Sequence, residues 1–170
     1  MTTYHERMDE VDRIVAAWRH ARPDLDVAPM EVLSRVSRLA RQLDLARKAT
    51  FQEHGLEVWA FDVLSALRRA GSPYQLSPSQ LIAEMMVSSG TMTNRIDRLA
   101  AGELVLRRPD PNDRRGILVQ LTEAGKEKVD GALADLLVHE AALLSDLTRA
   151  QRSKLTELLR ILSIGFEHDD

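Results

Sequence analysis

The chain has 170 residues, a length typical of one domain or of one domain with helical extensions. Hydrophobic residues make up 44% of it, which excludes global disorder, and an aromatic content of only 4% favours a mainly α-helical fold. The absence of cysteine excludes disulfides, thiolate metal sites and cysteine redox sensing. No apolar run approaches the roughly 20 residues that span a bilayer, and the N-terminus is unlike a secretory signal, so we expect a cytoplasmic protein.

The charge is distributed unevenly. A net charge of −3 argues weakly against nucleic-acid binding, but binding to DNA requires a basic face rather than a basic total. The segment 88–116 carries six arginines and four acidic residues, a charge of +2, whereas the rest of the chain carries −5. The sequence therefore concentrates positive charge in one segment.

Three helices are predicted in the first part of the chain. Apolar residues recur at helical spacing over 11–18 and again over 30–43, which indicates two amphipathic helices. Pro23 ends the first helix, and Gly55 is placed to cap the end of the second. A third helix is predicted over 58–70, with three apolar residues facing inward, Phe61, Leu64 and Leu67.

Two short helices separated by a tight turn follow. The first begins at Ser77-Pro78, with proline in its first turn, and ends near Met85. The run 88–90 breaks the helical pattern and offers an N-cap, and a fresh helix covers 91–101 until Gly102. Two short helices joined in this way form a helix-turn-helix.

A β-hairpin is predicted directly after the second of these helices. Residues 104–108 and 117–121 have the composition of strands, and the loop 109–113 between them consists of turn-forming residues. The hairpin has a basic tip. The sequence thus predicts a mainly α fold with a small β-wing, a winged helix-turn-helix.

Two further helices are predicted at the C-terminal end, one from Thr122 and a last one after Thr148. Helices with apolar faces therefore flank the helix-turn-helix on both sides. We interpret 1–170 as a single domain in which 5–54 and 122–165 mainly form a homodimer interface and 57–121 form the DNA-binding lobe. The alternative is that the terminal helices complete the core of a monomer.

The second helix of the helix-turn-helix has an apolar side and a polar side. Its polar side carries serine, threonine, asparagine and arginine, which hydrogen-bond base edges in the major groove, and its N-terminus favours phosphate. The candidate DNA-binding residues of this helix are Ser88, Ser89, Thr91, Thr93, Asn94, Arg95 and Arg98. An ordinary surface helix is the alternative interpretation.

The hairpin adds a second candidate contact with DNA. An arginine at such a tip can enter a narrow minor groove, where the potential is most negative. Arg114 and Arg115 are the candidates, and Asp113 can hold a neighbouring guanidinium in a bidentate pair. A solvated charged turn would explain the hairpin alone, but not the whole arrangement.

A family resemblance rests on these segments. RPDPNDRRG at 108–116, followed by VQLTEAG at 119–125, resembles the wing motif of the MarR (multiple antibiotic resistance regulator) family, and 89–99 is similar to its recognition helix. The resemblance covers nearly the whole chain. It implies a homodimer, a pseudo-palindromic operator and, usually, repression relieved by a ligand. It also implies that Arg115 reaches the minor groove with Asp113 as its partner.

A narrower resemblance concerns the ligand. The extra N-terminal helix with Trp18 and the run 59–64 resemble the urate-responsive branch of this family, which includes regulators of the PecS type and the actinobacterial TamR type. Segments 32–41 and 73–78 are especially similar to the TamR type, which responds to trans-aconitate. The resemblance implies a small anionic effector, urate or a tricarboxylate, held by Trp18, Asp62, Arg95 and Arg107.

The chemistry of this set suits an anion. Two arginines supply fixed positive charge and forked donors, and tryptophan supplies a flat face and one N–H donor. Asp62 could hold an arginine when the ligand is absent. Arg95 lies on the helix predicted to read DNA, so a ligand there can shift that helix. Two structural alternatives stay open: Trp18 could simply pack in an apolar stripe, and Asp62 and Arg107 could form a structural ion pair.

Other classes of function are disfavoured. The five histidines show no ligand spacing for a metal sensor: His5, His20, His54, His139 and His168. There is no glycine-rich phosphate loop and no nucleophile elbow, so we expect neither an enzyme nor a cofactor. An architectural DNA binder without an effector, or a regulator with a different effector, remains an alternative. The sequence does not choose between urate and a tricarboxylate, nor between repressor and activator, although the family favours a repressor.

Overall fold

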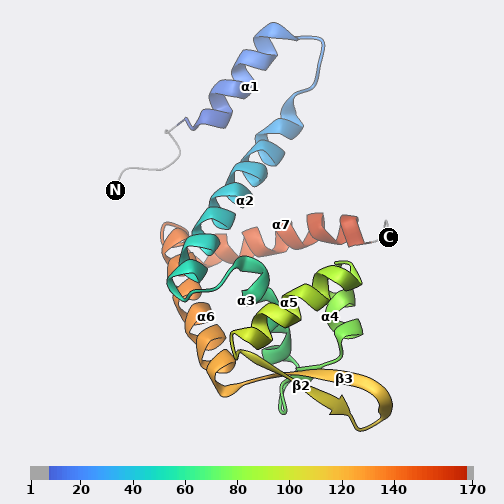
Figure 1. Cartoon of the computed structure of the whole chain (residues 1–170). Helices are drawn as coiled ribbons and strands as arrows, with labels where there is room; N and C mark the ends of the chain where they lie inside the picture. The colour runs from blue at the N-terminus through green and yellow to red at the C-terminus, as the bar shows by residue number, and fades with distance from the viewer. Residues whose placement is uncertain (1–7, 168–170) are drawn as a thin grey trace. The chain divides into compact units, whose positions relative to one another are not determined.

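A computed structural model of the chain describes residues 8–167, with side chains up to residue 165. The described residues form helices and a small sheet (Figure 1). The elements are α1 (Glu10–Ala21), α2 (Ala28–Glu53), α3 (Val58–Arg69), β1 (Gln75–Leu76), α4 (Pro78–Met85), α5 (Ser89–Ala101), β2 (Val105–Asp110), β3 (Asp113–Leu121), α6 (Glu123–Leu143) and α7 (Arg149–Glu167). The predicted fold class, mainly α with a small β-wing, is confirmed. The chain divides into two compact units, 1–49 and 50–170.

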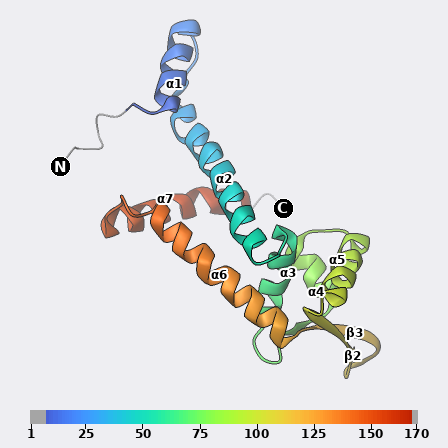
Figure 2. The same ribbon diagram turned by 60° about the vertical axis from the view of Figure 1, so that its left-hand side comes forward.

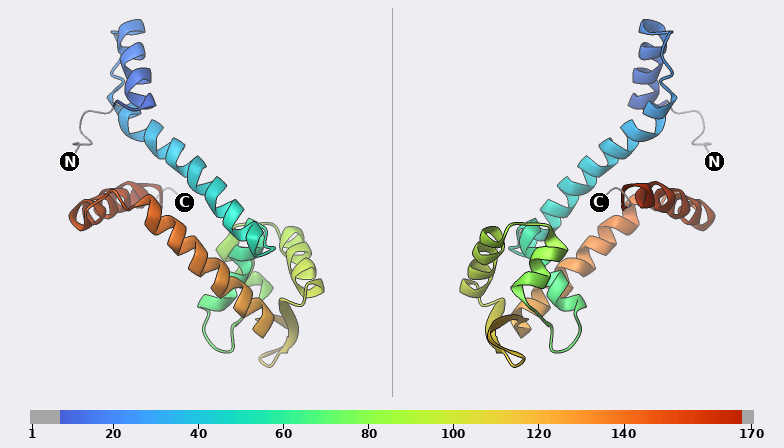
Figure 3. Two further views of the ribbon diagram at one scale, coloured as in Figure 1. Left: turned by 90° about the vertical axis from the view of Figure 1, so that its left-hand side faces the viewer. Right: turned by 90° about the vertical axis from the view of Figure 1, so that its right-hand side faces the viewer.

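The first unit contains α1 and the larger part of α2 (Figure 3). Asp9 caps α1 in a capping box: its carboxylate accepts from the Asp12 amide, and the Asp12 carboxylate accepts from the Asp9 amide, both at 2.9 Å. A small apolar cluster joins the two helices through Val11, Val15 and Val27, with Met30 against it.

Ion pairs reinforce the contact between α1 and α2. The Arg35 guanidinium donates to Asp9 at 2.8 Å and to Asp12 at 2.7 Å. The hydrogen bond from Arg35 is the main reason that the pKa of Asp9 falls from 3.8 to about 2. Two further pairs, Arg38 with Glu10 and Arg19 with Glu31, follow the order expected of antiparallel helices.

The core of the second unit surrounds α3. Its predicted inward residues Phe61, Leu64 and Leu67 are all buried, which confirms that prediction. α3 packs against α6, and Figure 2 shows the two helices side by side. The rings of Phe51 and Phe61 stack with centroids 3.9 Å apart. The apolar side of α5 closes the same core with Met92, Ile96 and Leu99.

The sheet has the strand order β1-β3-β2 and is antiparallel throughout. β1 was not predicted, because a strand of two residues carries no recognisable period; it pairs Leu76 with Val119. The predicted loop 109–113 was too long. β2 continues to Asp110 and β3 begins at Asp113, because β2 is an edge strand and Pro109, which has no N–H, can occupy such a strand.

A tight junction connects β2, β3 and α6. Thr122 caps α6: its hydroxyl accepts from the Gly125 amide at 2.9 Å and donates to the carbonyl of Glu103 at 2.8 Å. The backbone of Gly125 lies so close that a Cβ there would be 2.1 Å from the Leu104 carbonyl oxygen. Only glycine fits at this position without displacing backbone.

The last two helices carry most of their large apolar residues on the surface. Leu136 of α6 is buried, but its other predicted apolar positions and those of α7 are exposed. These exposed residues are Leu133, Leu137, Leu144, Leu155, Leu158, Leu159 and Leu162. Within 8–167, none of the helices has the length and apolar character needed to cross a membrane.

Candidate nucleic-acid interface and ligand site

The polar side of α5 faces solvent. Ser88 caps the helix by accepting from the Thr91 amide, and α5 therefore begins at Ser89, two residues earlier than predicted. Thr93 is tied to the helix through a hydrogen bond from its hydroxyl to the Ser89 carbonyl. All the candidate residues of this helix are exposed except Arg95, which is half-buried. The structure thus presents Ser88, Ser89, Thr91, Thr93, Asn94, Arg95 and Arg98 along one helix.

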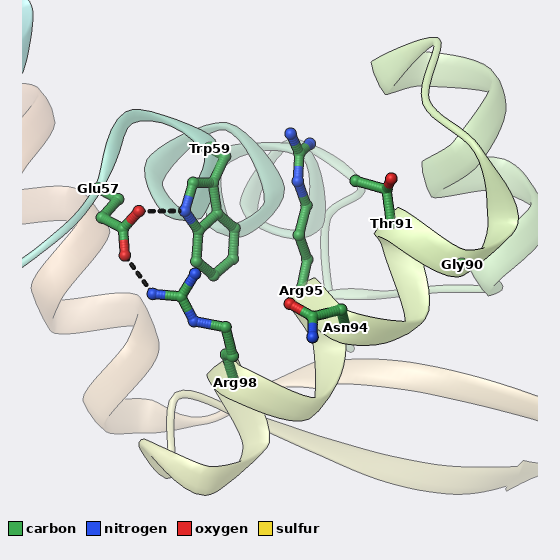
Figure 4. A pocket seen from close by; sticks show the side chains of 7 residues that line it. All are labelled: Glu57, Trp59, Gly90, Thr91, Asn94, Arg95 and Arg98. Carbon is green, nitrogen blue, oxygen red and sulfur yellow. Dashed lines mark hydrogen bonds and ion pairs between the residues drawn. The ribbon is translucent and has the colours of Figure 1, made fainter.

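One flank of α5 meets the beginning of α3. There, the guanidinium groups of Arg98 and Arg95 lie over the Trp59 ring, 4.7 Å and 5.7 Å from its centroid (Figure 4). Glu57 precedes α3 and pairs with Arg98, and it accepts from Trp59 Nε1 at 2.7 Å. An open cleft of about 530 Å³ is lined by Glu57, Trp59, Gly90, Thr91, Asn94, Arg95 and Arg98.

These contacts favour the ionised form of Glu57. The hydrogen bond from Trp59 and then the one from Arg98 lower the pKa of Glu57 below its ordinary value, because both favour the carboxylate over the neutral acid. The cleft beside α5 is therefore not uniformly basic: the guanidinium groups of Arg95 and Arg98 share it with the Glu57 carboxylate.

The opposite flank of α5 is joined to the wing. Arg107 of β2 forms an ion pair with Asp97 of α5. Since Asp97 and Arg98 are neighbours in the helix, α5 is held on one side by the wing and on the other by the beginning of α3. These ion pairs lie on both flanks of a helix whose apolar side is already fixed by Met92, Ile96 and Leu99 in the core.

The tip of the wing carries exposed arginines. Pro111 and Asn112 form the turn between the strands, and Arg114 and Arg115 follow it in β3 with their side chains exposed. Asp113 was expected to hold a guanidinium, but its carboxylate instead accepts from the Arg115 amide at 2.9 Å, and no ion pair joins it to an arginine in the described part of the chain. The aspartate therefore shapes the backbone of the turn.

The four residues predicted to bind an anion lie on separate elements. Trp18 belongs to the first unit, where its side chain is 44% exposed. Asp62 is half-buried on α3 in the second unit. Arg95 faces Trp59 on one flank of α5, whereas Arg107 pairs with Asp97 on the other. The alternative role of Arg107, a structural ion pair, is thus present in the structure, but the partner is Asp97 rather than the expected Asp62.

Sequence reasoning missed the partners of the arginines. Trp59 was noted only as part of a motif, and Glu57 and Asp97 were not singled out as contacts. An acidic residue directly before a helix is a recognisable feature, but its pairing with Arg98 joins residues 41 positions apart. His5 and His168 lie outside the residues that the structure describes. Within the described residues, no three histidine or carboxylate side chains are grouped so that they could hold a metal ion.

Comparison with known proteins places the chain in a family. Residues 54–116 match the model of the MarR family. The chain is 37% identical over 150 residues to the HTH-type transcriptional regulator PecS of Dickeya dadantii (strain 3937), and the match covers 88% of this chain and 90% of PecS. The chain belongs to the MarR family.

Solved structures of the MarR family have the same fold. Sco5413, a MarR family transcriptional regulator from Streptomyces coelicolor, is 26% identical and superposes with a TM-score of 0.67, covering 85% of this chain and 99% of Sco5413. A mutant MarR from E. coli, complexed with operator DNA, is 26% identical with a TM-score of 0.59, covering 81% and 99% of the two chains. The MarR-family relatives are transcription regulators, not enzymes.

Proposed function

We propose that this MarR-family regulator is a repressor that binds a pseudo-palindromic operator as a homodimer and leaves it when a small anion binds. One observation carries the DNA-binding part: the polar face of α5 and the exposed arginines of the wing belong to the same compact unit. A recognition helix and a basic hairpin in one unit match the two grooves of duplex DNA.

The roles of the residues follow from this placement. Ser88, Ser89, Thr91, Thr93, Asn94, Arg95 and Arg98 contact the major groove and its phosphates. Arg115 enters the minor groove, with Arg114 beside it and Asp113 shaping the turn. Residues 57–121 form the DNA-binding lobe of a single domain, and 5–54 with 122–165 provide the helices for dimerisation.

The dimer is supported by the exposed leucines of α6 and α7. Leu155, Leu158, Leu159 and Leu162 recur at the spacing of one helical face, and all are at least 40% exposed. A contiguous apolar surface of this kind marks a protein–protein contact. Two recognition helices related by a twofold axis would read half-sites about one helical turn apart.

The effector is a small anion, urate or a tricarboxylate such as trans-aconitate, and the protein belongs to the urate-responsive branch of the family. Trp18, Asp62, Arg95 and Arg107 are the proposed ligand residues. Arg95 connects one flank of α5 to Trp59, and Arg107 connects the other flank, through Asp97, to the wing. An anion that draws both guanidinium groups away from these partners would favour a different orientation of α5. The second candidate is a MarR-family regulator with another effector, or with none.

A gel-shift experiment tests the proposal. DNA from upstream of the protein's own gene is titrated with the protein alone, with urate and with trans-aconitate. We expect a specific complex that one of the anions dissociates. Trp18→Phe should leave the complex intact and raise the concentration of anion needed to dissociate it. Unchanged sensitivity of this variant would contradict the ligand site, and a specific complex indifferent to both anions would favour the second candidate.

A further inference from the structure

We propose that Glu57 is a positioning residue: it holds the Arg98 guanidinium against the beginning of α3 in the free protein and releases it to a DNA phosphate when the protein binds. The inference rests on the proposed function, in which α5 lies in the major groove. Glu57 itself lies outside the set of residues that the sequence predicts to contact DNA.

The contacts of Glu57 hold the Arg98 guanidinium in place. One carboxylate oxygen accepts from Trp59 Nε1 at 2.7 Å, and the other pairs with Arg98 (Figure 4). The indole hydrogen bond fixes the carboxylate, and the Trp59 ring supports the guanidinium, which lies 4.7 Å from the ring centroid. The head of Arg98 is thus held by a charge and by an aromatic face, both supplied by the beginning of α3 rather than by α5.

Exchange of this carboxylate for a phosphate is chemically simple. Carboxylates and phosphates both accept charge-assisted hydrogen bonds from a guanidinium, so the Arg98 nitrogen that donates to one Glu57 oxygen can donate to a phosphate oxygen instead. The side chains of Arg98 and Glu57 are 53% and 57% exposed, and an exposed ion pair of this kind contributes little to stability. Opening it therefore opposes binding only slightly.

The position of Arg98 favours a phosphate rather than a base. On a helical projection of α5, Asn94 lies near the centre of the solvent face, and Arg98 lies one turn further along, displaced toward the flank that meets α3. Residues at the edge of a recognition helix face the backbone that borders the groove. Contacts with phosphate are independent of sequence, so Glu57 should tune affinity without altering discrimination between sequences.

Glu57→Gln separates the charge from the hydrogen bonds. The amide oxygen can still accept from Trp59, but the competing negative charge is gone. We expect binding several-fold tighter at low salt, both to a duplex selected in vitro by the wild-type protein and to a scrambled duplex of equal length. Arg98→Ala should weaken binding to both and make the slope of log K against log salt shallower, by about 0.9 for each phosphate that the variant no longer neutralises.

The decisive comparison is a double-mutant cycle measured by fluorescence anisotropy over a range of NaCl concentrations. If Glu57 acts through Arg98, Glu57→Gln has no effect in the Arg98→Ala background. Glu84→Gln is the matched control: Glu84 also pairs with an arginine of the same unit, Arg69, and its replacement should not reproduce the gain. Circular dichroism verifies that each variant is folded.

Three results would overturn the inference: unchanged or weaker binding by Glu57→Gln, an equal gain when Arg98 is absent, or the same gain with Glu84→Gln. Failure of the wild-type protein to select any duplex is a different outcome. It would contradict the proposed function itself, and the inference with it.

Discussion

Arg115 stands apart from the other arginines of the second unit in how its backbone is held. The Asp113 carboxylate fixes the Arg115 amide, while the Arg115 side chain stays exposed next to the turn of the wing. A rigid backbone with an extended cationic side chain reduces the conformational entropy lost when the arginine enters a groove. The aspartate therefore prepares the arginine without neutralising it.

Replacement of this arginine should weaken binding to DNA. We expect Arg115→Ala to lose about 1–3 kcal/mol of binding free energy, roughly a 5- to 150-fold increase in Kd, without a change in thermal stability. Fluorescence anisotropy with a selected duplex measures the loss. Arg13→Ala, which removes the same charge from an exposed position of α1, is the control. Wild-type affinity of the Arg115 variant would refute the role of the wing.

Among the glycines of the chain, Gly125 has the least space for a side chain. Because a Cβ there would meet the backbone of Leu104, Gly125→Ala must displace either α6 or β2. We expect a loss of about 1–3 kcal/mol in the free energy of unfolding, measured by urea denaturation. Gly165→Ala in α7, where a Cβ meets nothing within 4 Å, should be neutral or slightly stabilising. Equal stability of the two variants would contradict the close approach.

At the scale of elements, α1 is joined to α2 by ion pairs as well as by apolar burial. Only Val11 and Val15 of α1 are buried, whereas Asp9, Glu10 and Asp12 all pair with arginines of α2. A helix held in this way responds to pH through its carboxylates.

The pH range of this response follows from Asp9. Its pKa is about 2 in the folded protein, below the ordinary 3.8, so its contribution to stability is fully present above pH 3.8 and is lost as the pH falls toward 2. Hydrogen exchange of the amides of α1 should accelerate over that range. Asp9→Asn, which can still cap the helix, should exchange several-fold faster already at neutral pH, whereas Asp44→Asn should not. Slow exchange in both variants would refute the role of the Arg35 pair.

Most elements could be predicted from periodicity and capping. The starts and ends of the helices agree with the expected ones to within about two residues, since Pro23, Ser77 and Ser88 act locally. β1 escaped prediction because only pairing with β3 makes it a strand. The candidate residues of α5 and the wing could likewise be placed on an exposed face, but their partners could not, because Glu57 meets Arg98 only through the packing of α3 against α5.

At the scale of the whole molecule, the exposed apolar surface of α6 and α7 leads us to expect a homodimer. Leu158→Glu combined with Leu162→Glu should convert a dimer into a monomer, because two charges would otherwise be buried in the interface. Light scattering coupled to size exclusion measures the mass. Glu157→Lys, on the opposite side of α7, should remain dimeric. A double variant that retains the wild-type mass would place the dimer contact elsewhere.

The junction at Thr122 has a mechanical consequence. The hydroxyl of Thr122 binds the carbonyls of Glu103 and Leu104, and the close approach of Gly125 leaves no slack between α6 and the start of β2. The hairpin is therefore joined rigidly to the N-terminal end of α6. We therefore expect a tilt of α6 to move the hairpin with it, because the contacts at Thr122 and Gly125 join the two directly.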